Sequence, residues 1–235
     1  MTLPLARRLR EDTWHLHTRA EQAGVMPALL QGKLPRPAYA TLLQQLHALY
    51  LALEAALDRQ AGHPWLAAWQ MPALRRAPAL VDDLAVLAGP ADSLAAPDHP
   101  ALLPAMDALC TRIDSLAATE PGLLLAHAYV RYLGDLSGGQ VLARRVQAAY
   151  GLAPGAGTRF YDFGEPAAAA ALLGRCRQAL ADTVPTPAEC DALVAEACWC
   201  FEQHVALFEQ LASLPPGEPG QPAQPGHPAP RGPTA

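Results

Sequence analysis

Residues 126–140 read AHAYVRYLGDLSGGQ and place three glycines, Gly134, Gly138 and Gly139, within six positions. The apolar pattern of a helix continues on both sides of them, which predicts one helix over about residues 126–150. Each glycine inside a helix costs about 1 kcal/mol relative to alanine, which is abundant elsewhere in this chain. Because glycine has no Cβ, we expect the helix to bend here or to let a flat ligand lie directly against its backbone.

The composition of the whole chain favours helices. Its 235 residues suffice for one large domain or two small ones, and alanine and leucine dominate while aromatic residues are only 6%. Few segments are rich in the β-branched and aromatic residues that strands prefer, so we predict an all-α fold. The net charge of -5 gives no basic field that would hold nucleic acid or an anionic membrane, and partners are expected to be proteins or small molecules.

The cysteines and the N-terminus indicate a cytoplasmic protein. Five cysteines are an odd number and form no CxxC pair, which argues against a zinc site and a disulfide framework. The N-terminal segment is amphipathic and charged, unlike a secretory signal. No stretch of about 20 apolar residues is present, so we expect neither a membrane span nor a membrane anchor.

Helical periodicity and its breaks divide the chain into a single helical domain, residues 1–214, and a tail, residues 215–235. The expected helices cover about residues 2–24, 36–60, 75–87, 101–119, 126–150, 166–182 and 187–214, with Gly89 and Pro90 ending the third. Residues 151–166 are expected to form a loop that packs down through its aromatic side chains. The tail has proline or glycine at roughly every second position and is predicted to be disordered; a polyproline recognition segment is the alternative.

His17 lies on the mostly apolar face of the first expected helix, with Glu21 one turn later on the same face. Most helical histidines are surface residues or hydrogen-bonded core residues. A carboxylate four residues on can, however, accept a hydrogen bond from the second imidazole nitrogen, as beside many metal-ligating histidines. Both interpretations stay open from the residues alone, whereas His15 is expected to be solvated.

Asp135 stands between Gly134 and Leu136 inside the glycine-rich stretch. It could be a local cap at a helix end, or a carboxylate held in a pocket beside whatever lies against the glycines. A phosphate-binding loop is excluded, because no strand precedes GDLSGGQ and no Lys-Ser/Thr pair follows it.

Two segments, HTRAE at 17–21 and AHAYVRYLGDLSGGQVL at 126–142, resemble the signature segments of haem oxygenases. FYDF at 160–163, the segment around Arg177 and CFEQHVALFEQL at 200–211 resemble that family in the same order. The similarity covers about residues 5–214. It implies a single-domain helical bundle that binds haem, as both cofactor and substrate, between its first helix and a distal helix kinked at the glycines.

The resemblance also implies roles for the residues around the iron. His17 is expected to be the proximal iron ligand with Glu21 as its hydrogen-bond partner, which leaves one axial position open for oxygen. Gly134, Gly138 and Gly139 are expected to contact the distal face of haem, with the first two closest. Asp135 is expected to anchor a chain of water molecules that delivers protons on the distal side. Arg131 is expected to join this distal polar network, and Phe201 is expected to line the pocket wall.

The haem propionates are expected, by position in the family, to meet Arg10, Tyr129 and Arg177. Leu173 departs from the family pattern, because mammalian members carry a basic residue there. This departure puts the in-plane rotation of haem, and hence the carbon that is cleaved, in question. His204 stands where mammalian members carry an asparagine.

The activity implied is oxidative cleavage of haem to biliverdin, carbon monoxide and ferrous iron by a soluble, bacterial-type enzyme. It uses dioxygen and electrons from a reductase or a ferredoxin. Iron acquisition and supply of bilin to a phytochrome-type acceptor are both compatible with it. A non-catalytic haem carrier or sensor and a helical scaffold without cofactor are the competing classes.

Overall fold

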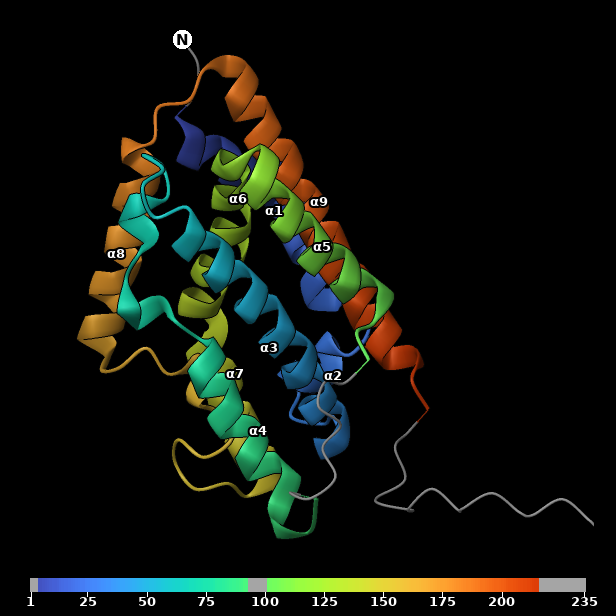
Figure 1. The fold of residues 1–235 in the computed structure, drawn as a ribbon. Coiled ribbons are helices and arrows are strands. Elements are labelled where there is room, and N and C mark those ends of the chain that lie inside the picture. The colour runs from blue at the N-terminus through green and yellow to red at the C-terminus, as the bar shows by residue number, and fades with distance from the viewer. Residues whose placement is uncertain (1–3, 93–100, 216–235) are drawn as a thin grey trace, which may run out of the picture.

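The computed structural model describes residues 4–92 and 101–215, and this part of the chain contains helices and turns but no strand. In Figure 1, α3 runs through the middle of the view, with α8 on its left and α5 and α9 on its right. The long helices are α1 (Leu5–Gln22), α3 (Arg36–Arg59), α4 (Ala77–Asp92), α5 (Pro104–Thr119), α7 (Gly134–Tyr150), α8 (Pro166–Asp182) and α9 (Pro187–Ser213). The all-α prediction is confirmed.

The long helices meet around one leucine-rich core. Helix α1 packs along α9, α9 also contacts α5, and α3 packs against both α4 and α5. The five leucines that repeat along α3 at helical spacing are all buried: Leu42, Leu46, Leu49, Leu53 and Leu57. Helix α9 begins with a capping box in which Thr186 and Glu189 satisfy each other's backbone N–H groups.

The glycine-rich stretch does not continue one regular α-helix, and the irregular turn lies just before the glycines. Helix α6 (Leu124–Ala128) passes into a π-helical turn, η4 (Tyr129–Leu133), and α7 then starts at Gly134. A π-helical turn inserts extra backbone into a helix and is frequently found at functional sites. This turn contains Arg131 and ends two residues before Asp135.

Helix α4 continues to Asp92, so the prediction that it ends at Gly89 and Pro90 is wrong. A proline in a helix leaves the carbonyl four residues earlier without its N–H donor. Here that carbonyl belongs to Val86, and it accepts a hydrogen bond of 2.9 Å from Arg36 of α3. The guanidinium replaces the missing donor, and the helix continues for another half turn.

The end of α1 also differs from expectation. The helix stops at Gln22, and Gly24 has a positive φ of 47° where the chain turns against α9. A Cβ on Gly24 would overlap the carbonyl of Phe208, so only glycine allows the backbone of Val25 to reach and bond that carbonyl. The short helix α2 (Met26–Leu30) follows, which the sequence did not predict.

The aromatic loop packs down as predicted: Phe160, Tyr161 and Phe163 are buried around the short helix η5 (Arg159–Tyr161). Three further short helices, η1 (Ala67–Trp69), η2 (Pro72–Leu74) and η3 (Pro121–Leu123), connect the longer ones. No helix among the described residues is both long enough and apolar enough to cross a membrane. The predicted disorder of residues 215–235 concerns residues that, apart from Pro215, lie outside the described part.

Candidate functional site

A cavity of about 420 Å³ is lined by residues of α1, α2, α3, η4, α7, η5 and α9. Most of its lining is apolar, which suits a large organic ligand, and a small number of polar groups interrupt it. The polar side chains in the lining come from His17, Glu21, Arg131, Asp135, Ser137, Tyr161 and His204. Residues from both halves of the chain therefore meet around one space.

His17 lines this cavity from α1, with its side chain 42% exposed. Its imidazole stacks on Trp14, at 5.8 Å between ring centroids, and meets the edge of Phe201 at 6.0 Å. The Nδ1 atom is buried without a hydrogen-bond partner and lies 3.9 Å from Glu21 Oε1. This distance exceeds a hydrogen bond, so the predicted hydrogen bond to Glu21 is absent from this arrangement. His15 is exposed, as expected.

The three glycines of the stretch do not share one environment. Gly134 and Gly138 line the cavity, and a Cβ added to either would meet no atom within 4 Å. Gly139 is buried and does not line the cavity, because it faces the ring of Tyr161, which would lie 3.2 Å from an added Cβ. The missing side chain of Gly139 makes room for Tyr161, and a contact between Gly139 and the ligand stays a prediction.

Asp135 and Arg131 form an ion pair of 2.8 Å one helical turn apart at the cavity wall. The hydroxyl of Tyr50 on α3 donates a hydrogen bond to the second carboxylate oxygen of Asp135, and Arg131 Nε also reaches this hydroxyl at 3.4 Å. Asp135 is thus held in a buried network and is not a solvent-exposed helix cap. Tyr50 was missed by sequence reasoning, because on α3 it looks like any core aromatic residue.

Burial shifts the titration of this network. It raises the pKa of Asp135 above its ordinary value, although Arg131 and the hydrogen bond from Tyr50 act in the opposite direction. Burial also raises the pKa of Tyr50 well above 10.0. For Arg131, burial lowers the pKa but the nearby Asp135 and Tyr50 outweigh it and raise the pKa overall. A carboxyl with a raised pKa can exchange protons closer to neutral pH.

His204 on α9 lines the same cavity and is 2% exposed. Its Nδ1 lies 2.7 Å from the carbonyl oxygen of Cys200, which can only accept, so Nδ1 carries the proton. Burial, together with the positive charge of Arg131, lowers the pKa of His204 to about 3. Nε2 is therefore an unprotonated acceptor, and it is buried without a protein partner.

The residues expected at the propionates lie outside the cavity lining. Arg10 is exposed on α1, and its charge acts on the half-buried Tyr129, which has Thr13 as a hydrogen-bond partner. Arg177 is exposed on α8. The structure thus places Arg10 close to Tyr129, and the propionate role of all three residues stays a prediction.

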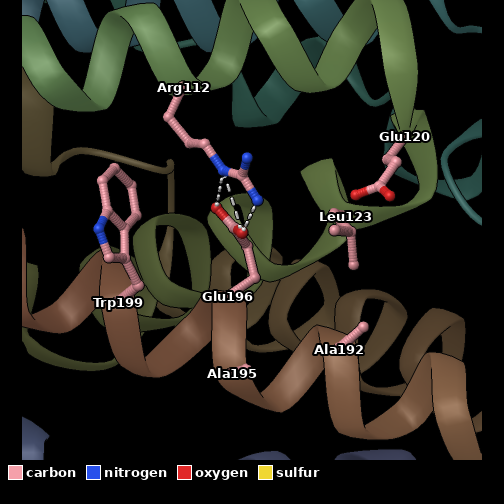
Figure 2. A pocket seen from close by; sticks show the side chains of 7 residues that line it. All are labelled: Arg112, Glu120, Leu123, Ala192, Ala195, Glu196 and Trp199. Atoms are coloured by element: carbon pink, nitrogen blue, oxygen red, sulfur yellow. Dashed lines mark hydrogen bonds and ion pairs between the residues drawn. The ribbon is translucent and has the colours of Figure 1, made fainter.

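A second cavity, of about 490 Å³, has a different character (Figure 2). Arg112 of α5 points onto Glu196 of α9 and binds both carboxylate oxygens, with a shortest distance of 2.7 Å. His127 Nε2 donates to the same carboxylate at 2.9 Å. This set joins α5, α6 and α9 through Glu196 and includes no residue predicted for the ligand site; His127 is a core histidine that is hydrogen-bonded at Nε2 only.

The residues around the first cavity fit haem. A flat macrocycle needs a surface without Cβ atoms, and Gly134 and Gly138 provide open space above their backbone. An iron ligand requires a neutral imidazole, and the orphaned Nδ1 of His17 is free to donate to a water or a carboxylate once the other nitrogen binds a metal. The apolar lining and the polar group around Asp135 complete a site for a largely hydrophobic ligand with reactive chemistry at one face.

Comparison with known proteins leads to the same family. A family model described as Heme oxygenase matches residues 3–210. The chain is 34% identical over 211 residues to Heme oxygenase 1 of a Nostoc species, covering 90% of this chain and 87% of that protein. It is 36% identical over 216 residues to the human Heme oxygenase 1, covering 91% of this chain and 74% of that protein.

Solved structures show the same likeness. The crystal structure of heme oxygenase-1 from Synechocystis in complex with heme has a TM-score of 0.80 to this fold and 34% sequence identity. The match covers 89% of this chain and 92% of that one. Heme oxygenase-2 of Synechocystis, in complex with heme and NO, has a TM-score of 0.82 at 33% identity, covering 89% and 85%. The chain, in which His17 and the glycine-rich helix line one largely apolar cavity, belongs to the haem oxygenase family.

Proposed function

We propose that the protein cleaves haem oxidatively to biliverdin, carbon monoxide and ferrous iron, using dioxygen and external electrons. The observation that carries this proposal is that one cavity brings together His17, the bare backbone of Gly134 and Gly138, and the buried Asp135–Arg131 pair. Bound haem would supply the iron that activates dioxygen and would itself be the molecule cleaved.

On the proximal side, His17 is the residue that would hold the iron. Its ring is kept in place by the stacked Trp14 and the edge of Phe201. Glu21 lines the cavity close to Nδ1, where a small side-chain movement or one water would complete a hydrogen bond. That bond would fix the tautomer of His17.

On the distal side, Asp135 would store and pass protons. Its carboxylate is held at one oxygen by Arg131 and at the other by the hydroxyl of Tyr50. The raised pKa of Asp135 matches a group that gives and regains a proton during turnover. Arg131 keeps the carboxylate pointing in one direction, and the apolar lining around it limits competing reactions with bulk water.

The three glycines of the glycine-rich stretch, Gly134, Gly138 and Gly139, would help to form the haem site in two ways. The first two let the ligand approach the α7 backbone, and Gly139 lets Tyr161 support α7 from another side. We further propose that Arg10, Tyr129 and Arg177 bind the propionates, since Tyr129 already lies beside Arg10 and Thr13 of α1. Leu173 is half-buried and offers no charge to them.

The electron donor would be a reductase or a ferredoxin, because this oxidation consumes electrons that dioxygen and haem do not provide. A phytochrome-type protein is a candidate acceptor for the bilin. All five cysteines are free, which suits a reducing compartment, and we propose the cytoplasm. A non-catalytic haem carrier would use His17 but would have no need for the buried proton-exchanging pair of Asp135 and Arg131.

Two steps of one experiment test the proposal. Purified protein is titrated with haemin and the Soret band is recorded; ascorbate, or a ferredoxin with its reductase, is then added under oxygen. We expect a saturable Soret shift followed by loss of the band and growth of biliverdin absorbance. Absence of a Soret shift would refute haem binding, and a Soret band that persists after the reductant would leave only the carrier.

A further inference from the structure

The short helix η5, which carries Phe160 and Tyr161, is held in place by two buried charged residues from another part of the chain. Arg76, in the turn between η2 and α4, is 6% exposed, and Asp83 on α4 is fully buried. Neither lines the haem cavity. Arg76 and Asp83 bind backbone atoms of η5. The position of η5 therefore depends on these two residues and not on the side chains of η5 itself.

Asp83 binds the start of η5. One carboxylate oxygen accepts the backbone N–H of Arg159 and the other accepts that of Phe160, each at 2.7 Å. Burial raises the pKa of Asp83, and these two hydrogen bonds oppose the rise. Both oxygens of this buried carboxylate therefore have specific backbone partners.

Arg76 binds the end of the same segment. Its Nη1 donates to the carbonyl oxygens of Phe160, at 3.2 Å, and Asp162, at 2.6 Å. Its guanidinium carbon also lies 4.0 Å from the ring centroid of Phe163. Its remaining nitrogens donate to carbonyls of Ala73 and Leu74 in η2, so the guanidinium joins η2 to the segment that follows η5.

The segment held in this way contacts the distal network directly. The ring of Phe160 meets the edge of the Tyr50 ring at 5.6 Å, and the hydroxyl of Tyr50 donates to Asp135. The ring of Tyr161 fills the space left by Gly139 on α7. A shift of η5 would therefore move the phenol that binds Asp135 and would release the helix that bears the ligand-facing glycines.

We propose that Arg76 and Asp83 are positioning residues for haem cleavage, acting as a clamp that sets η5 against Tyr50 and α7. The proposal rests on the proposed function. Burying two charges costs several kcal/mol unless each is fully paired, and apolar residues would pack this region as well or better. Unlike apolar residues, however, the two charged side chains form directional hydrogen bonds. These bonds fix both N–H and C=O groups of the three-residue helix η5.

The chain provides a matched pair of variants. Asp83→Asn keeps the shape of the side chain but leaves one oxygen to accept, and turns an NH₂ group toward a backbone N–H. Asp82→Asn alters the neighbouring, half-exposed carboxylate, which only pairs with the Arg159 side chain at 2.9 Å. Arg76→Met removes every donor of the clamp, while Arg76→Lys restores a charge and up to three donors.

We expect Asp83→Asn and Arg76→Met to accelerate amide hydrogen exchange in residues 134–139 and 157–163 of the ligand-free protein. They should weaken haemin binding about tenfold, equivalent to ~1.4 kcal/mol. Asp82→Asn should match the wild type in both measurements, and Arg76→Lys should recover part of the loss. Turnover should fall further than occupancy explains, because Asp135 is no longer held correctly.

A double-mutant cycle tests the route of this effect. If the clamp acts through Phe160 and Tyr50, Asp83→Asn lowers the biliverdin yield much less in a Tyr50→Phe background than in the wild type. Additive effects, exchange in residues 134–139 equal to that of Asp82→Asn, or failure of all clamp variants to fold would overturn the positioning role. Failure of the proposed function is distinguishable, because the wild type itself would then produce no biliverdin while the exchange measurement would still report on the clamp.

Discussion

The ring of Tyr161 lies against the bare Cα of Gly139, so closely that a Cβ on this glycine would come within 3.2 Å of the ring. One position earlier, a Cβ on Gly138 would point into open cavity. Successive residues of a helix are about 100° apart, so neighbouring glycines can serve different partners. This contrast separates glycines used for folding from those used for the ligand.

We therefore expect Gly138→Ala and Gly139→Ala to change the free energy of unfolding in opposite directions. Gly138→Ala should keep or raise the free energy of unfolding, by up to about 1 kcal/mol, because alanine favours the helix. It should nevertheless weaken haemin binding at least about tenfold. Gly139→Ala should lower the free energy of unfolding by about 1–2 kcal/mol, because Tyr161 must move. Chemical denaturation and Soret titration measure both quantities, and equal behaviour of the two variants would contradict the assignment.

His17→Ala should remove the proximal ligand, because no other imidazole in the cavity lining lies on α1. We expect an altered ferric spectrum, loss of turnover, and partial recovery on adding free imidazole. His15→Ala, on the exposed side of the same helix, is the matched control and should behave as the wild type. An unchanged spectrum in His17→Ala would show that another group binds the iron.

Asp135→Asn should bind haemin but lose most biliverdin formation, by a factor of about 10²–10⁴, the range typical of a lost acid–base group. Tyr50→Phe should lose less, because Arg131 still holds one carboxylate oxygen. Since burial raises the pKa of Asp135 above 3.8, the wild-type rate should depend on pH above that value, and this dependence should vanish in Asp135→Asn. A normal yield of biliverdin from Asp135→Asn would remove this residue from the mechanism.

His204 should remain neutral throughout the working pH range, because its pKa is lowered to about 3. Between pH 6.5 and about 3 the unfolded chain binds a proton here that the folded chain does not. The contribution of the neutral His204 to the free energy of unfolding should thus be complete above pH 6.5. Below pH 6.5, and down to about pH 3, this contribution should fall by about 1.4 kcal/mol per pH unit. Nitrogen NMR of the imidazole measures this pKa, and unfolding of His204→Gln should show a shallower acid dependence. Titration of His204 near pH 6.5 would contradict the buried tautomer.

Glu196 should matter for stability and not for the chemistry of the ligand site. Burial opposes ionisation, but the hydrogen bonds from His127 and Arg112 prevail and lower the pKa of Glu196 to about 2. Its contribution is therefore complete above pH 4.5 and is lost as the pH falls towards 2. Glu196→Gln should lower the free energy of unfolding at neutral pH by about 2 kcal/mol. Haemin affinity per folded molecule should not change; a large loss of affinity would link this cluster to the cavity.

Several features of the protein follow from local sequence alone. Leucine spacing predicted α3, and Pro166 with Asp182 and Pro187 with Leu214 bracketed α8 and α9 to within a residue. The glycine-rich stretch predicted a bend or a face open to a flat ligand, and the space above Gly134 and Gly138 is open. These features are readable because helix periodicity and the missing Cβ are properties of neighbouring residues.

Other features depend on contacts between distant segments. Arg36 lets α4 pass Pro90, Tyr161 accounts for Gly139, and Tyr50 supplies the second hydrogen bond to Asp135. A periodic pattern shows which face of a helix is buried but not which residue meets it there. The sequence by itself therefore determined the long helices and the open backbone at Gly134 and Gly138. Only the tertiary structure decided how Asp135 is held, because its partner comes from a helix 85 positions away.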